Sequence, residues 1–460
     1  MKTRHLRAIL VILTVFSWIA AASAQQAPQK LTLREAIQLA LRKNVDIQVS
    51  ATEVSEAAGT RTRNLALLLP HASGDALANL VKNNLSIEGI TFPGVPKTVG
   101  PFAYYDFRVA GSQSIVDRQA YHNWKASIRQ EDATKLNYQD TRDLIVREAA
   151  GLYLQSETAE AEIEAAQSRV QTSQVLETLA NDQHDQGLAT AIDVVRAQVE
   201  LARDQQSLLV AQDNYETSLL ALARFLGLSP GTPIELAEKL EFRHVDTPDV
   251  DSVLPQALAA RDDYRALFSD QQSILEQQKA SHSRYLPTFA LNGNYGAAGR
   301  NFGAMPSSGG IEGIVSVTIF DRDRTGEKQQ LESRADRLKA QIDDLSRSIE
   351  QDLRKAVLDI HSAEQQVSVT QAALDLARRE LTLAEDRFRN GVTDNIEVTT
   401  AQETLTTAQD DRIAAIAQHE DACAALARAL GATEKKNYEK YIGHLDSSEA
   451  GDGQKGMKQP

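Results

Sequence analysis

The feature that most constrains the fold of this chain is an eight-residue stretch that occurs twice, 204 residues apart. Gly-Leu-Ala-Thr-Ala-Ile-Asp-Val begins at Gly187, and Gly-Val-Thr-Asp-Asn-Ile-Glu-Val begins at Gly391. The same spacing, without a gap, relates the stretch Leu-Ala-Arg-Phe-Leu-Gly that ends at Gly227 to the stretch Leu-Ala-Arg-Ala-Leu-Gly that ends at Gly431. Glycine can end a helix in the left-handed conformation, and an acidic residue just beyond suits the start of the next helix. Each copy therefore predicts the tip of a long helical hairpin, and the chain is a duplication.

The composition agrees with long helices and excludes several classes of protein. Of 460 residues, 42% are hydrophobic but only 5% are aromatic, which is typical of helices that pack side by side. The formal net charge of −14 argues against a nucleic-acid partner, because phosphate binding needs a basic face. The single cysteine, Cys423, excludes a disulfide within the chain, so packing or assembly must hold the protein together.

The N-terminus predicts a secretory signal peptide over residues 1–24. Lys2, Arg4 and Arg7 precede roughly 15 apolar residues, and Ala22-Ser23-Ala24 forms a small-residue cleavage site. A membrane anchor is the weaker alternative because it needs about 20 apolar residues. No later segment of the sequence is long and apolar enough for a transmembrane helix, so any membrane span of the mature protein must be made of strands.

Four segments are predicted to be strands, and most of them alternate apolar and polar residues. In the second segment Tyr105, Phe107 and Val109 share one face, whereas Asp106 and Arg108 share the other. A strand between lipid and water has this pattern, although a half-buried strand of a soluble sheet fits any one segment equally well. The predicted bounds are about 71–82, 104–115, 287–296 and 311–320.

The remaining chain is predicted to be helical and to repeat one plan, in which a single helix precedes the first strand of each repeat. The first of these helices is predicted to begin at a capping box formed by Thr32 and Glu35. Repeat 1 spans residues 25–230 with a helical hairpin over 117–227, and repeat 2 spans 251–431 with a hairpin over 321–430. A linker, 231–250, joins the repeats, and a tail over 432–460 is predicted to be disordered. The long arm of each hairpin has over 60 residues and would extend roughly 100 Å. Two apolar stripes on the returning helix of repeat 1 predict partners on both of its sides, as in a closed ring of helices.

These elements constrain how the chain can assemble. Four strands cannot close a membrane barrel, which needs about eight, so the protomer is expected to oligomerise, and a trimer would supply 12 strands. Polar residues on one strand face, such as Asp106, Arg108, Asn292 and Asn294, predict a water-filled interior. The expected fold class is therefore mainly α with transmembrane β: a 12-stranded barrel continued by an α-helical barrel.

The whole mature chain, about residues 31–431, resembles the TolC-like outer-membrane efflux proteins. The resemblance rests on the duplicated tips, the Leu-Pro before each first strand, and the Ser114-Ile115-Val116-Asp117 and Thr318-Ile319-Phe320-Asp321 exits from each second strand. It implies a homotrimeric channel in the outer membrane with a periplasmic helical extension. The channel would be the passive exit duct of a tripartite efflux pump or type I secretion system, with a periplasmic adaptor and an inner-membrane pump as partners.

The resemblance also implies roles for residues at the hairpin tips. Glu397 matches the first acidic position of a ring that narrows the entrance, whereas Thr400 occupies the second position, which is often acidic in the family. Asp193 matches the acid of the first tip, and Asp394 lies near the second. All three are candidates for the pore constriction, with simple helix N-terminal acids as the alternative. The candidate tip and adaptor contacts are Gly187, Ile192, Val194, Gly391, Ile396 and Val398.

Four further residues are expected at the junction between helices and strands. Pro70 and Pro287 would break the helices before the strands, and Asp117 and Asp321 would cap the helices that follow them. The sequence contains no phosphate-binding glycine loop, zinc motif or nucleophile elbow, so no enzyme activity, cofactor or metal is expected. The alternative function is a periplasmic coiled-coil scaffold or adaptor without a pore, which has no need for paired alternating strands.

Overall fold

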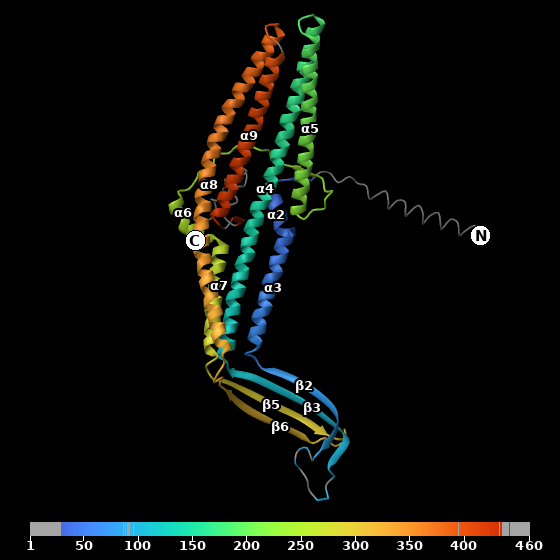
Figure 1. The fold of residues 1–460 in the computed structure, drawn as a ribbon, viewed down its shortest axis with the longest axis vertical. Coiled ribbons are helices and arrows are strands. Elements are labelled where there is room, and N and C mark those ends of the chain that lie inside the picture. Colours follow the sequence, from blue (N-terminus) through green and yellow to red (C-terminus); the bar gives the residue numbers. More distant parts are fainter. Residues whose placement is uncertain are drawn as a thin grey trace, which may run out of the picture. The chain divides into compact units, whose positions relative to one another are not determined.

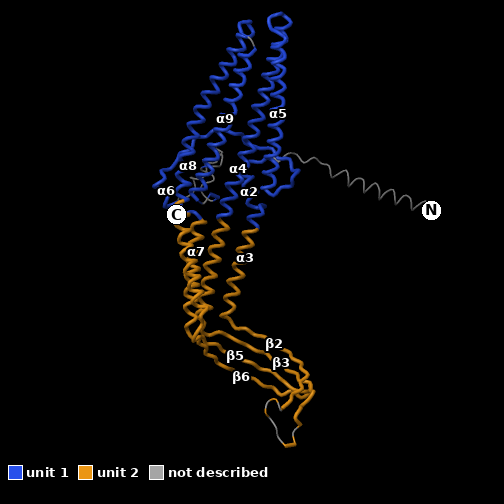
Figure 2. Tube along the Cα trace, in the orientation of Figure 1, with its two compact units in different colours: residues 1–48, 140–261, 348–460 blue, residues 49–139, 262–347 orange. Residues whose placement is uncertain are grey.

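The computed structural model describes residues 29–85, 87, 89, 93–94, 96–393, 395–431, 433–434 and 441. Its contacts divide the chain into two compact units, coloured separately in Figure 2. Unit 1 contains residues 1–48, 140–261 and 348–460, and unit 2 contains residues 49–139 and 262–347. The expected signal peptide, 1–24, lies outside the described residues. Among the residues described, no helix combines the length and the apolar composition that crossing a membrane requires.

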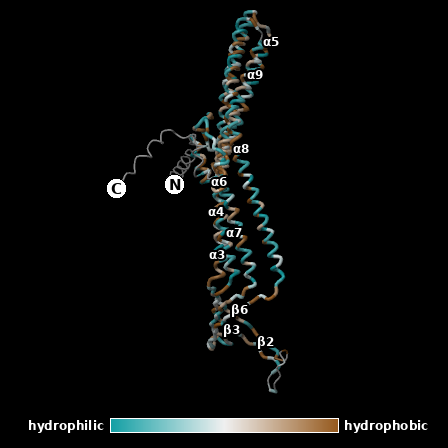
Figure 3. The backbone as a smooth tube through the Cα atoms, turned by 90° about the vertical axis from the view of Figure 1, so that its left-hand side faces the viewer, coloured by the Kyte–Doolittle hydropathy of each residue, from teal (hydrophilic) through white to brown (hydrophobic). Residues whose placement is uncertain are grey.

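Two helical hairpins of nearly equal length confirm the predicted duplication (Figure 1). The first joins α4 (Arg118–Asp185, 68 residues) to α5 (Ala191–Phe225, 35 residues). The second joins α8 (Asp323–Arg389, 67 residues) to α9 (Asn395–Ala429, 35 residues). Polar and apolar residues are interspersed along all four helices, as Figure 3 shows. The helices therefore bury narrow stripes and leave the remaining surface polar.

Both hairpin turns use glycine in the left-handed conformation, with φ of 74° at Gly187 and 66° at Gly391. The N–H of Gly187 donates to His184 O (2.9 Å), and the N–H of Leu188 donates to Gln183 O (2.8 Å). This pair of bonds is the Schellman motif, which satisfies carbonyls at the end of a helix. Gly391 and Val392 make the same pair with Phe388 O and Arg387 O, both at 2.9 Å.

Unit 2 contains a four-stranded antiparallel sheet in the order β2-β3-β5-β6. Its strands are β2 (His71–Asn84), β3 (Thr98–Val116), β5 (Thr288–Gly299) and β6 (Ser307–Ser316). The register places Asp75 opposite Arg108 and Asn292 opposite Glu312, so polar residues of different strands share one face. The other face is apolar and exposed, with Val109 at 63%, Tyr295 at 67% and Ile311 at 82%.

The strand ends differ from the predicted bounds because pairing, not alternation alone, sets them. β3 begins at Thr98 rather than near 104, because it continues to pair with β2 beyond a bulge, as far as Asn84. β6 ends at Ser316 rather than near 320, because its last partner on β5 is Thr288, the first residue of that strand. The alternating residues 317–320 thus continue past the end of the sheet.

The segments predicted as single helices before the first strand of each repeat are each broken in the structure. The first forms α2 (Leu33–Lys43) and α3 (Val45–Ala66), and the second forms α6 (Val250–Ala260) and α7 (Asp262–Ser283). Asn44, at the first break, donates through Nδ2 to Phe225 O (3.2 Å) and accepts from Asp46 N (2.8 Å). Tertiary docking therefore interrupts a sequence whose local propensity is helical throughout.

Within unit 1, the predicted linker 231–250 contains a short strand, β4 (Ile234–Leu236), that pairs in parallel with β1 (Gln29–Leu31). The capping box predicted at Thr32 and Glu35 is present at the start of α2. Most of the predicted disordered tail lies outside the described residues, but the three tail residues that are described contact the rest of the protein, and Tyr441 among them is 2% exposed. Thr433 is fully buried, and Glu434 pairs with Arg142 at 2.5 Å.

Candidate functional site

The first hairpin tip buries its acidic residue. Asp193 is 7% exposed, and its Oδ2 accepts hydrogen bonds from Thr190 N (3.0 Å) and Thr190 Oγ1 (2.6 Å). Arg196 lies 3.6 Å from its other carboxylate oxygen. The carboxylate therefore binds the N-cap residue of α5 and lies at the positive end of the helix dipole, which is the helix N-terminal role considered as the alternative to pore lining.

The second tip exposes its acidic residue. The Glu397 side chain is 42% exposed, and its Oε1 lies 3.0 Å from Nε of Arg387 on α8. Its Oε2 accepts a hydrogen bond from Thr393 Oγ1 (2.5 Å). Arg387 was not identified from the sequence, because its pairing crosses the turn between two helices. Asp394, the third candidate acid, lies outside the described residues.

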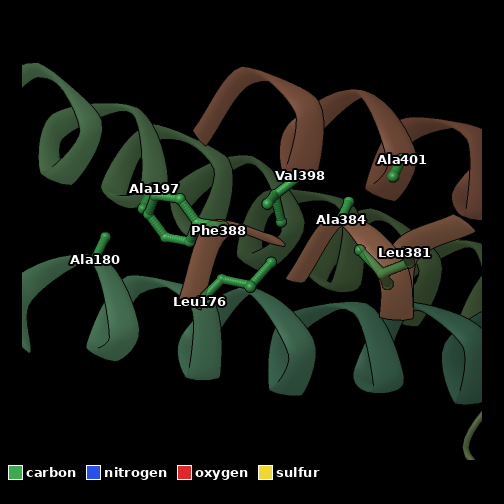
Figure 4. Packing of buried hydrophobic residues seen from close by; sticks show 8 residues of the cluster. All are labelled: Leu176, Ala180, Ala197, Leu381, Ala384, Phe388, Val398 and Ala401. Atoms are coloured by element: carbon green, nitrogen blue, oxygen red, sulfur yellow. The ribbon is translucent and has the colours of Figure 1, made fainter. Parts of the chain in front are cut away.

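Buried contacts join the two tips to each other. Gln183 on α4 donates to Phe388 O (2.8 Å), and Asn395 on α9 donates to Asp193 O (3.0 Å). Beside these bonds, apolar side chains of α4, α5, α8 and α9 form one cluster, in which the Phe388 ring lies among its neighbours (Figure 4). The cluster consists of Leu176, Ala180, Ala197, Leu381, Ala384, Phe388, Val398 and Ala401.

A buried polar network lies further along the same hairpins. Ser173 on α4 donates to Asp204 Oδ2 on α5, and Gln402 on α9 donates to Ser173 Oγ and, at 3.4 Å, to Asp204 Oδ2. The three residues are 1%, 8% and 5% exposed, respectively. Because buried polar groups need partners, this network fixes the relative position of the two hairpins.

The apolar tip surface differs from the predicted set. Ile192 and Ile396 are exposed, at 57% and 49%, as a contact surface requires. Val398, in contrast, has no exposed surface, and Val194 packs against the buried cluster. Leu188 and Val392, which directly follow the two glycines, are 62% and 64% exposed and were not identified from the sequence.

The predicted junction residues lie between helices and strands of unit 2. Pro70 and Pro287 directly precede β2 and β5, where a residue without an N–H is tolerated. Asp117 accepts from Ala120 N (2.8 Å) at the start of α4. Asp321 accepts from Asp323 N (3.0 Å) at the start of α8.

Two arginines that the sequence did not single out reinforce the second junction. Arg284, just after α7, contacts Asp321 (2.9 Å) and Glu327 (2.7 Å). Arg324 is buried, donates to Arg284 O (2.7 Å) and stacks on the Tyr285 ring (3.9 Å). Charge-assisted bonds of this kind are stronger than neutral ones, so they fix the start of α8 relative to the end of α7.

Two polar surfaces in unit 2 suit contact with water. On the polar sheet face Arg108 donates to Asn294 (2.6 Å) and Asp106 (3.3 Å), joining β3 to β5. Among the helices, α3, α4 and α7 enclose an open groove of about 530 Å³. Its polar lining includes Glu53, Glu56, Thr60, Asn64, Asn123, Gln130, Thr134, Asn137 and Gln277.

Comparison with known proteins assigns the family. The model of the family described as outer membrane efflux protein matches residues 36–228 and 253–432. The chain belongs to the outer membrane efflux protein family. The efflux channel is similar to the probable efflux pump outer membrane protein TtgC of Pseudomonas putida, with 25% identity over 412 residues. That alignment covers 82% of the channel chain and 78% of TtgC.

A second relative and two solved structures agree with this family. The pyoverdine export outer membrane protein OpmQ of Pseudomonas putida is 23% identical over 313 residues, covering 66% of each chain. The fold matches the CmeC outer membrane channel of Campylobacter jejuni, with a TM-score of 0.79, 16% identity and 90% coverage of both chains. It also matches the outer-membrane channel OprN, with a TM-score of 0.73, 20% identity and coverage of 87% and 89%. The protein is thus an outer-membrane efflux channel with a periplasmic helical extension, and not the scaffold without a pore that the sequence left open.

Proposed function

We propose that the channel is a passive homotrimeric exit duct, gated at its hairpin tips and opened when a periplasmic adaptor and an inner-membrane pump dock. The observation that carries this proposal is the four-stranded sheet, which has one polar face, one exposed apolar face and edge strands β2 and β6 paired on one side only. Three copies joined edge to edge would close a 12-stranded barrel with its polar face toward water. The chain itself would catalyse no reaction and bind no cofactor.

A second unpartnered surface supports the trimer. Val369, Leu376 and Leu383 follow one another at seven-residue spacing on α8 and are 68%, 64% and 64% exposed. We call these three residues the α8 ridge. A heptad of apolar residues is the pattern by which one helix packs on another. The ridge would therefore pack on a helix of the next copy, such as the exposed Ile192, Val195 and Val199 stripe of α5.

In this proposal Glu397 supplies the exposed charge at the constriction. Asp193 would act by holding the first tip, since its carboxylate is occupied in capping α5. Glu397 is partly compensated by Arg387, and such a half-exposed pair contributes about 0–1 kcal/mol. Its effect on permeating ions should therefore exceed its effect on stability.

Single-channel conductance in a planar bilayer tests the proposal. Wild-type trimers should give small cation-selective steps. Glu397→Ala should weaken block by divalent cations severalfold, and Arg387→Ala should strengthen it, because removing the guanidinium leaves the carboxylate uncompensated. The proposal of a duct would be contradicted if folded, membrane-inserted trimers conduct no ions, both as wild type and as a variant with a loosened tip. Equal block in all three proteins would leave the duct intact but reject Glu397 as its constriction.

A further inference from the structure

A small cavity in unit 1 lies where residues 237–241, which we call the strap, cross α4 and α9. The cavity has a volume of about 30 Å³, which is enough to hold a water molecule. Acidic side chains from three segments line it: Glu157 from α4, Glu241 from the strap, and Glu420 and Asp421 from α9. The remaining walls are mostly apolar.

Glu157 is the most buried of these acids. It lines the cavity and is 5% exposed, and its buried Oε1 has no hydrogen-bond partner among the described residues. An ionised carboxylate in such a place is destabilised, because it loses its hydration and gains no compensating partner. A proton or another cation removes that penalty.

The acidic groups around Glu157 make its ionised form still less favourable and a bound cation more favourable. Glu238 of the strap accepts from Leu33 N (3.3 Å), and Glu420 has its own Oε1 without a hydrogen-bond partner. Lys239 of the strap contacts Glu164 at 2.5 Å instead. Further titratable or charged groups nearby are Tyr153 and Glu160 of α4, Arg243 after the strap, Glu364 of α8, and His419 and Cys423 of α9.

The pKa of Glu157 agrees with this geometry. Burial, and after it the carboxylates of Glu238, Glu420 and Glu160, together raise the pKa of Glu157 to about 8. Among the described residues, no three His, Cys, Asp or Glu side chains meet in a way that could hold a metal ion. The occupant that fits is therefore the smallest cation.

We propose that Glu157 is a proton-binding site that keeps the strap closed over α4 and α9 at neutral pH. The proton sits on the Glu157 carboxyl, and its loss leaves carboxylates of α4, the strap and α9 repelling one another. This inference does not depend on the proposed gate. Between the ordinary glutamate pKa and about 8, the folded chain holds a proton that the unfolded chain has released. Stability contributed by Glu157 is therefore present at low pH and lost as pH rises through about 8.

Infrared spectroscopy of the full-length channel in detergent tests the proposal directly. A carbonyl band of a buried, protonated carboxylic acid should persist at pH 7, titrate with a midpoint near pH 8, and be absent in Glu157→Gln. Glu148→Gln, which changes an exposed acid on the same helix, should leave the band unchanged. Glu420→Gln should lower the midpoint, because it removes a neighbouring carboxylate.

Stability and hydrogen exchange provide independent readouts. Glu157→Gln mimics the protonated acid. The ratio of its folding equilibrium constant to that of wild type should therefore rise by up to tenfold for each pH unit between 5 and 8. At pH 9 its strap should exchange more slowly than the wild-type strap. A missing band at pH 7, or a band that survives Glu157→Gln, would overturn the proposal. A third outcome would also contradict the proton site: no infrared band, together with stabilisation of wild type but not of Glu157→Gln by Na⁺ or Ca²⁺ at pH 9. That outcome would show that the site binds a metal ion instead of a proton.

Discussion

Glycine ends each of the four hairpin helices that the sequence marks, but it does so for two different reasons. At the tips, a Cβ added to Gly187 or Gly391 would meet no atom within 4 Å, so only the left-handed backbone requires glycine there. At Gly227 (φ 66°) a Cβ would lie 2.9 Å from Lys43 Cβ and 3.0 Å from Lys43 O. A Cβ at Gly431 would likewise lie 2.9 Å from Arg261 N and 3.0 Å from Ala260 C, in the backbone between α6 and α7.

This difference predicts unequal costs for the same substitution. Gly187→Ala should lower the free energy of unfolding by about 1 kcal/mol, the cost of the left-handed conformation alone. Gly227→Ala should lower it by about 2–4 kcal/mol, because overpacking against the Lys43 backbone adds to that cost. Thermal denaturation of both variants beside wild type measures the difference. Equal shifts in Tm would show that the contact between Lys43 and Gly227 yields easily.

At the scale of elements, local chemistry made the hairpins predictable. The tips, the capping box at Thr32 and the capping acids at Asp117 and Asp321 each involve residues close in sequence, and the sequence identified all of them. The breaks at Asn44 and Arg261 were missed, because their cause is docking against residues far away in the chain, such as Phe225. The end of β6 was missed for a related reason, since its partner strand sets it.

The residues of the candidate site were likewise predictable where a local motif identifies them and were missed where contacts between helices decide. Glu397 was identified from its place in the repeated motif, whereas the burial of Val398 depends on packing across four helices. The pairing of Glu397 with Arg387 and the network of Ser173, Asp204 and Gln402 also cross between helices. No periodicity along a single helix reveals such partners.

The duplication itself offers a matched test of the link between hairpins. Gln198 and Gln402 occupy equivalent positions in the two repeats, but Gln402 is buried at the network while Gln198 is exposed. Gln402→Leu leaves Asp204 buried with one partner fewer, at a cost of about 1–3 kcal/mol. We expect it to loosen the hairpins and raise the open probability in bilayer recordings. Gln198→Leu should do neither, and equal open probabilities would contradict a restraining role for the network.

Over the whole protein, two different kinds of exposed apolar surface lack a partner within the described chain: one on the sheet and one on α8. The sheet is exposed on an apolar face and at two edges, and α8 carries the ridge of Val369, Leu376 and Leu383. Exposure of these surfaces to water is unfavourable, and contiguous apolar patches of this kind mark protein interfaces or membrane contact. Lipid can cover the sheet face, whereas the edges require another strand and the ridge suits another helix.

The ridge gives the assembly a test that does not involve the membrane. In one protomer Leu376 and Leu383 are mostly exposed, so Leu376→Ser combined with Leu383→Ser should leave its fold unchanged. If the ridge is buried between copies, each serine should remove about 2 kcal/mol of apolar burial per interface. Trimers of the variant should then dissociate at a lower temperature, as measured by light scattering in detergent. Arg379→Ser, an exposed substitution on the same helix, should have no such effect. Unchanged trimer stability together with lost adaptor binding would instead assign the ridge to the adaptor.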